Sequence, residues 1–114
     1  MTGWEERLGR WLLALLFAAG AVQKAFDPAP AAGLLEGMGL PGALVWPALA
    51  FNATAALALV TGTAIRPTAL ALAAYSAVTS IFHFLPEDPW QMSIFVKNWA
   101  ISGGLLVLAA HHRR

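Results

Sequence analysis

Four apolar blocks, each about as long as a membrane span, constrain what this chain of 114 residues can fold into. They cover about residues 8–26, 43–65, 67–85 and 92–110, and proline, glycine or charged residues separate them. A helix needs about 20 residues to cross roughly 30 Å of hydrocarbon at about 1.5 Å per residue. The pattern therefore predicts an all-α protein, a bundle of four transmembrane helices in a single domain over residues 1–114.

The composition points to the same class of protein. Hydrophobic residues make up 59% of the chain and charged residues 11%, which is too little charge to coat a soluble domain of this size. Cysteine is absent, so thiolate chemistry and cysteine-ligated metals are excluded. The net charge of +1, without a basic run among aromatics, argues against nucleic acid as a partner. The sequence predicts a multi-pass protein of the cell membrane, surrounded by the lipid bilayer.

The positions of the basic residues predict an orientation. Five of the seven lysines and arginines fall on one side of the predicted spans: Arg7, Arg10, Arg66, Arg113 and Arg114. Because lysine and arginine concentrate in cytoplasmic loops, this side should be cytoplasmic. Both termini are then inside, neighbouring helices run antiparallel, and Glu87 and Asp88 lie outside.

The outer connection "DPAPAAGLLEGMGLPG" allows two interpretations. Leu34, Leu35 and Met38 have a helix-like spacing, which is typical of a short amphipathic segment in the membrane interface. The glycines and prolines equally fit an ordinary loop.

Polar residues concentrate in the outer half of the predicted bundle. Lys97 and Asn98 lie about 8 Å inside the outer end of the fourth block, at about 1.5 Å per residue. Because a polar stripe in lipid must face other helices or a wet cavity, we expect Lys97 to be buried in a shared pocket. The predicted ligand-binding residues are Lys97, Asn98, His83, Lys24, Asn52, Asp27, Thr79 and Tyr75.

A purely structural interpretation of these residues also stays open. Lys24 and Lys97 are close enough to the interface for their stems to carry the ammonium to water. Serine, threonine and asparagine often join helices by hydrogen bonds without any ligand. His83 has no second histidine at ligand spacing, so no metal site is predicted. The tryptophans fit interfacial anchors better than ligand-stacking groups; they are Trp4, Trp11, Trp46, Trp90 and Trp99.

Four stretches carry a further signal: "RLGRWLLALLFAAGAVQKAFDP", "TAIRP", "FHF" and "FVKNWAISGGLLVLA". Together they resemble the DoxX family of small four-helix membrane proteins over nearly the whole chain. Asn52 departs from the family pattern, because many members carry a glutamate there and an amide can neither ion-pair nor carry a proton. The matching positions are Gly20, Lys24, Phe95, Lys97, Asn98, Ala100, Gly103, Gly104, Leu105 and Leu106.

The resemblance implies a role beside membrane redox chemistry, since some relatives look like subunits of thiosulfate, quinone or oxidative-stress assemblies. It predicts an accessory subunit that works with other membrane or peripheral redox proteins and holds a quinone or another lipophilic ligand in an outer-leaflet pocket. Lys97 and Asn98 would donate to a carbonyl oxygen, and His83 would donate or relay a proton. The alternatives are a scaffold for partner proteins without a ligand and a small transporter formed by a homo-oligomer. Whether the chain catalyses a reaction itself stays open.

Overall fold

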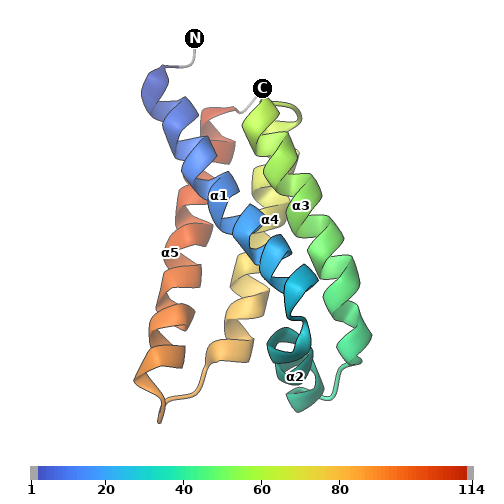
Figure 1. Cartoon of the computed structure of the whole chain (residues 1–114). Helices are drawn as coiled ribbons and strands as arrows, with labels where there is room; N and C mark the ends of the chain where they lie inside the picture. Colours follow the sequence, from blue (N-terminus) through green and yellow to red (C-terminus); the bar gives the residue numbers. More distant parts are fainter. Residues whose placement is uncertain (1–2, 113–114) are drawn as a thin grey trace. The chain divides into compact units, whose positions relative to one another are not determined.

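The computed structural model describes residues 3–112, and these form helices, turns and loops with no strand among them (Figure 1). The all-α prediction is confirmed. The chain forms two compact units, Met1–Thr63 and Ala64–Arg114, which are described separately. In chain order the helices are α1 (Trp4–Phe26), α2 (Ala29–Gly37), the 3-10 helix η1 (Gly42–Leu44), α3 (Val45–Thr61), α4 (Ile65–Thr79), the 3-10 helix η2 (Ser80–His83) and α5 (Pro89–His111).

Three helical segments are long and apolar enough to cross a membrane by themselves: Gly42–Thr61, Ile65–His83 and Pro89–His111. Helices α1 and α2 meet that standard only as a pair, and the pair is bent by 94° (Figure 1). Charged residues toward both ends of α1, among them Glu6, Arg10 and Lys24, lower its mean hydropathy. The described residues thus contain three candidate spans, or four if the bent pair crosses as one.

The observed helix ends differ from the predicted ones for local reasons. Helix α1 already begins at Trp4, where two glutamates in the first turn suit the positive end of the helix dipole. Helix α3 already ends at Thr61, because Gly62 adopts a left-handed conformation with φ of 79°. Helix α4 begins two residues before Pro67, whose missing N–H would have no helical partner in a first turn.

The start of α5 is set by the pair Asp88 and Pro89. The Asp88 carboxylate accepts hydrogen bonds from the backbone N–H groups of Trp90, at 3.0 Å, and Gln91, at 3.4 Å. Aspartate before a proline in the first turn is a strong helix start. The helix therefore begins three residues earlier than the predicted start at about residue 92.

The outer connection contains a helix, so the ordinary loop is the wrong one of the two interpretations. Helix α2 has nine residues and none of them is buried. It ends where Gly39 turns with φ of 80° and donates from its N–H to the Glu36 carbonyl at 3.0 Å. Its position in the membrane interface stays a prediction.

In the first unit α1 packs against α3, and the two helices run antiparallel (Figure 1). The beginning of α1 meets the end of α3 at Arg10, whose Nη1 donates to the Leu59 carbonyl at 2.5 Å. Arg10 Nε also donates to Glu6 Oε2 at 3.0 Å, and this ion pair joins the buried Arg10 to the half-buried Glu6. The buried hydrophobic residues of this unit are Ala14, Phe17, Ala21, Val45, Ala55, Ala56 and Leu59.

The second unit repeats this arrangement with α4 and α5. Arg66, in the first turn of α4, donates from Nη1 to the Ala109 carbonyl near the end of α5 at 2.9 Å. Midway along the pair, the buried Ser102 hydroxyl donates to the Ala73 carbonyl at 2.7 Å, an interhelical bond of the kind that joins membrane helices. The core of this unit consists of Ala69, Leu72, Ala73, Leu105, Leu108 and Ala109.

Candidate functional site

Two of the predicted ligand-binding residues, Lys24 of α1 and Asn52 of α3, meet at Gly20. A Cβ atom built on Gly20 would lie 3.4 Å from Asn52 Nδ2 and 3.7 Å from Lys24 Nζ. Gly20 and Lys24 are four residues apart and therefore share one face of α1. Asn52 continues the buried stripe of α3 that contains Ala55, Ala56 and Leu59, so its amide is directed toward the packed face. The ammonium, the amide and the glycine form what we call the Lys24–Asn52 cluster.

The Asn52 amide is the unusual member of this cluster. Asn52 is only 2% exposed, and its Oδ1 atom is buried without a hydrogen-bond partner among the described residues. A buried amide oxygen that accepts no hydrogen bond costs about 1–3 kcal/mol. Inside the hydrocarbon of a membrane there is no water that could donate the missing hydrogen bond to this oxygen. Asn52 Oδ1 is thus a buried acceptor that receives no hydrogen bond from residues 3–112.

The cluster lies toward the end of the first unit where α1 finishes and α3 begins, away from the Arg10 contacts. Lys24 is in the last turn of α1 and is half-buried. Asp27, predicted as part of the site, caps the end of α1 through its backbone N–H, which donates to the Gln23 carbonyl at 2.8 Å. Its side chain is exposed.

The remaining predicted residues belong to the second unit. His83 Nδ1 lies 2.7 Å from Gln91 Oε1, and since an amide oxygen only accepts, Nδ1 carries the proton of this bond. The Thr79 hydroxyl donates to the Tyr75 carbonyl of its own helix at 2.8 Å, so it is available only as an acceptor. His83, Thr79, Tyr75 and Asn98 are all half-buried.

Lys97 is exposed, so the expectation that it is buried is wrong. The four-carbon stem of lysine, about two turns after the start of α5, is long enough to carry the ammonium out of the packed face. This finding agrees with the alternative in which the side chain extends toward the interface.

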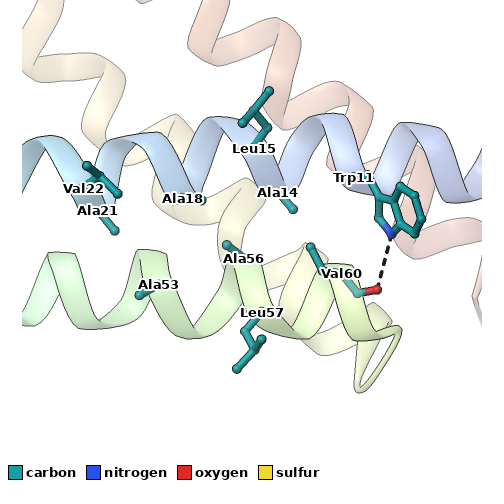
Figure 2. A pocket seen from close by; sticks show the side chains of 10 residues that line it. All are labelled: Trp11, Ala14, Leu15, Ala18, Ala21, Val22, Ala53, Ala56, Leu57 and Val60. Atoms are coloured by element: carbon teal, nitrogen blue, oxygen red, sulfur yellow. Dashed lines mark hydrogen bonds between the residues drawn. The ribbon is translucent and has the colours of Figure 1, made fainter.

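A separate apolar groove of about 670 Å³ runs along α1 and α3 (Figure 2). Ala18 of the groove and Gly20 of the cluster lie on nearly opposite sides of α1, because two residues correspond to about 200° of helix. At one end the Trp11 indole N–H donates to the Val60 carbonyl at 3.4 Å, as Figure 2 shows. None of the predicted site residues lines the groove, which is bordered by Trp11, Ala14, Leu15, Ala18, Ala21, Val22, Ala53, Ala56, Leu57 and Val60.

The cluster can bind but carries no reactive group of its own. An ammonium offers hydrogens to an oxygen, and an amide oxygen accepts one. Among the described residues, no group of three or more histidine, aspartate and glutamate side chains is placed to hold a metal ion.

Sequence reasoning missed three residues that matter here. Gly20 was noted for its position on α1 and as a matching family residue, but not as the point where Lys24 and Asn52 come together. Gln91 was not recognised as the partner of His83, eight residues away across a turn. Ser102 gave no signal, because a single serine in an apolar helix does not reveal which carbonyl it will reach.

Comparison with known proteins places the chain among membrane proteins. The sequence model of the family described as DoxX matches residues 7–84. The inner membrane protein YqjF of Escherichia coli strain K12 is 31% identical over 103 residues, which are 90% of this chain and 79% of that protein. No solved structure matches the chain.

Proposed function

The chain belongs to the DoxX family of multi-pass membrane proteins, and from this premise we propose that it binds the polar headgroup of a lipophilic ligand, such as a quinone, through Lys24 and Asn52. In this proposal it serves as an accessory subunit of a membrane redox assembly. A bound quinone would supply the redox chemistry, and the chain would supply binding and orientation.

The observation that carries the proposal is the Asn52 oxygen, which is buried and has no hydrogen-bond partner among residues 3–112. Buried polar groups are nearly always hydrogen-bonded, and an exception often marks a functional site. The neighbouring Lys24 ammonium adds a second polar group that is costly to hold within a span. The quinol form could donate a hydroxyl hydrogen to Asn52 Oδ1, and the carbonyl of the quinone form could accept from Lys24 Nζ and Asn52 Nδ2, the two donor atoms nearest Gly20.

The proposal includes the arrangement in the membrane. We place four spans in one domain, with α1 as the first span, α2 in the outer membrane interface, and both termini in the cytoplasm. Arg7, Arg10 and Arg66 support this orientation, whereas Arg113 and Arg114 lie outside the described residues. The cluster then belongs to the outer leaflet.

Cysteine labelling tests this orientation directly, because the chain has no cysteine of its own. Single variants Asp88→Cys and His112→Cys should react with a membrane-impermeant maleimide from opposite sides of sealed vesicles. Both positions flank α5 and lie outside its buried core, so Asp88→Cys should loosen only the first turn, where it removes the helix cap, and His112→Cys should leave the packing unchanged. Labelling of both from the same side would contradict the orientation.

Ligand binding tests the site. We expect the purified protein to bind a decyl-substituted quinone or its quinol stoichiometrically, and Asn52→Leu and Lys24→Met to weaken that binding at least tenfold. Neither variant should unfold, since replacing an unsatisfied buried polar group by an apolar one of similar shape is nearly neutral or stabilising. Binding is measured by titration calorimetry and folding by thermal melting, both in detergent.

Lys97→Met is the matched control, because it replaces lysine by methionine, as Lys24→Met does, but at an exposed position of α5. It should bind normally, and it also tests the sequence-based prediction that Lys97 takes part in the site. A protein that binds neither ligand form, with Asn52→Leu less stable than the wild type, would instead favour the scaffold, in which the polar residues only join helices.

A further inference from the structure

The apolar groove along α1 and α3 points to a lipid ligand. We propose that this groove holds an acyl chain of an anionic phospholipid, and that Arg7 binds the phosphate of the same lipid. The lining runs from Trp11 to Val22 on α1 and from Ala53 to Val60 on α3. The proposal is independent of the Lys24–Asn52 cluster, because no residue of that cluster lines the groove.

The lining of the groove combines buried alanines with larger, exposed side chains. Ala14, Ala21 and Ala56 are buried in the first unit. The polar atom of these side chains is the Trp11 indole nitrogen, and its N–H already donates to the Val60 carbonyl. A polar occupant would find no partner along the groove, so the occupant should be hydrocarbon. The larger exposed side chains are Trp11, Leu15, Val22, Leu57 and Val60.

The length of the groove matches one leaflet of a bilayer. Trp11 and Val22 are eleven residues apart, which is about 16 Å of helix at about 1.5 Å per residue. One leaflet contributes about half of the roughly 30 Å of hydrocarbon in a bilayer. Figure 2 shows Trp11 at one end of the groove and Val22 toward the other. Because tryptophan concentrates at the membrane interface, the Trp11 end is where a lipid chain should enter from its headgroup.

Arg7 supplies a cation at this end of the groove. It lies one turn before Trp11 and eleven residues, or about three full turns, before Ala18, so it shares the groove face of α1. Its side chain is exposed, and its guanidinium has no hydrogen bond or ion pair with the other described residues, in contrast to Arg10. Glu5 is two residues away and therefore lies about 200° around the helix.

The groove and the cation together define the class of ligand. Arginine binds phosphate through two parallel hydrogen bonds, and basic sites beside membrane helices bind anionic headgroups. The groove accepts any hydrocarbon chain, so the preference for an anionic lipid should come from Arg7. A free phosphate has no chain to fill the groove. A transmembrane partner helix would cross both leaflets, whereas the groove is only about half as long.

Native mass spectrometry in detergent, which counts bound lipids, tests the headgroup site. The probes are dioleoylphosphatidylglycerol and dioleoylphosphatidylcholine, which share their chains and differ in net charge. The wild type should bind one phosphatidylglycerol about fivefold more tightly than phosphatidylcholine, the factor expected for one arginine. In Arg7→Met the two lipids should bind equally. Lys97→Met, which removes an exposed lysine of α5, should keep the preference. Glycerol phosphate, a headgroup without chains, should not compete.

Ala18→Phe tests the groove itself. Ala18 lines the groove between its two ends, so a phenylalanine ring would occupy the space of the chain and weaken binding of both lipids at least tenfold. Ala19→Phe is the matched control, because it adds the same ring at an exposed position outside the lining and should bind as the wild type does. Ala53→Phe fills the same groove from α3 and serves as the second variant if thermal melting shows that Ala18→Phe is unfolded.

Each outcome decides one part of the proposal. If Arg7→Met keeps the preference for phosphatidylglycerol, the headgroup site is overturned. If folded Ala18→Phe and Ala53→Phe bind lipid as the wild type does, the groove is not the site of the chain. If the wild type forms dimers that both variants dissociate with either lipid present, a second copy occupies the groove and the proposal is overturned. None of these results decides the proposed function, which is tested with quinone and quinol at Lys24 and Asn52.

Discussion

Replacing Arg10 by methionine is expected to lower the free energy of unfolding by about 3 kcal/mol, because it removes a part-buried ion pair together with a buried hydrogen bond. Arg10 is 8% exposed and donates both to Glu6 and to the Leu59 carbonyl. Methionine keeps most of the apolar stem, so the loss measures the guanidinium itself. Reversible unfolding in mixed micelles, with circular dichroism as the signal, gives the free energy.

The position of Leu59 explains why this contact matters. At the end of α3 the N–H groups of Gly62 and Thr63 both turn back to the Ala58 carbonyl, at 2.9 and 3.1 Å. The Leu59 carbonyl, one of the last four of its helix, takes its hydrogen from Arg10 of the other helix instead.

Arg7→Met is the control for this prediction, since it removes an exposed arginine from the same helix. Its effect should stay within about 0.5 kcal/mol, as for most surface substitutions. Equal losses for the two variants would show that net charge, and not the contacts of Arg10, is responsible.

Gly62→Ala is expected to cost about 2 kcal/mol, the second largest effect. Gly62 ends α3 with φ of 79°, a conformation that costs an L-residue roughly 1–2 kcal/mol. The added Cβ would also lie 3.2 Å from Arg10 Nη1, closer than ordinary contacts, so the guanidinium would have to shift away from the Leu59 carbonyl.

The control for Gly62 is Gly9→Ala, which has open space and a helical conformation. It should be stabilising by about 0.5–1 kcal/mol, so the two alanine variants should differ in sign. A double variant, Arg10→Met with Gly62→Ala, should lose less than the sum of the single losses, because the crowding of the guanidinium disappears with it. If the double variant lost as much stability as the two single variants together, the proposed contact between Arg10 and Gly62 would be contradicted.

The helices could be predicted from the sequence because their signals are local. Apolar blocks of span length, with Pro67 between the second and third and the stretch "PEDP" before the fourth, predicted α1, α3, α4 and α5 to within a few residues. The bend between α1 and α2 was not predicted. It arises because Asp27 and Pro28 end one helix and begin the next within two residues, and the angle of such a break depends on the packing that follows.

The site could be predicted only in part, because contacts between helices depend on rotation about each axis. Lys24 and Asn52 were both predicted, and the structure brings them together at Gly20. Lys97 was expected to be buried from its depth alone, but depth along a helix does not fix the direction of a long side chain. Arg10 was used only as a basic residue for predicting the orientation. Its hydrogen bond to the Leu59 carbonyl, 49 residues away, could not be predicted because no sequence pattern signals such a contact.

The two arginines that reach across to a partner helix bear on how the chain is made. In each unit the bond joins the beginning of one helix to the carbonyl two residues before the end of the other, Arg10 to Leu59 and Arg66 to Ala109. During biogenesis each pair can therefore leave the insertion machinery with its guanidinium already hydrogen-bonded, without waiting for the other pair. A cation that had no such bond would be costly within the lipid for the whole time between synthesis of the first pair and synthesis of the second. Because of this repeated contact, we expect each helical pair to be able to insert into the membrane without the other pair.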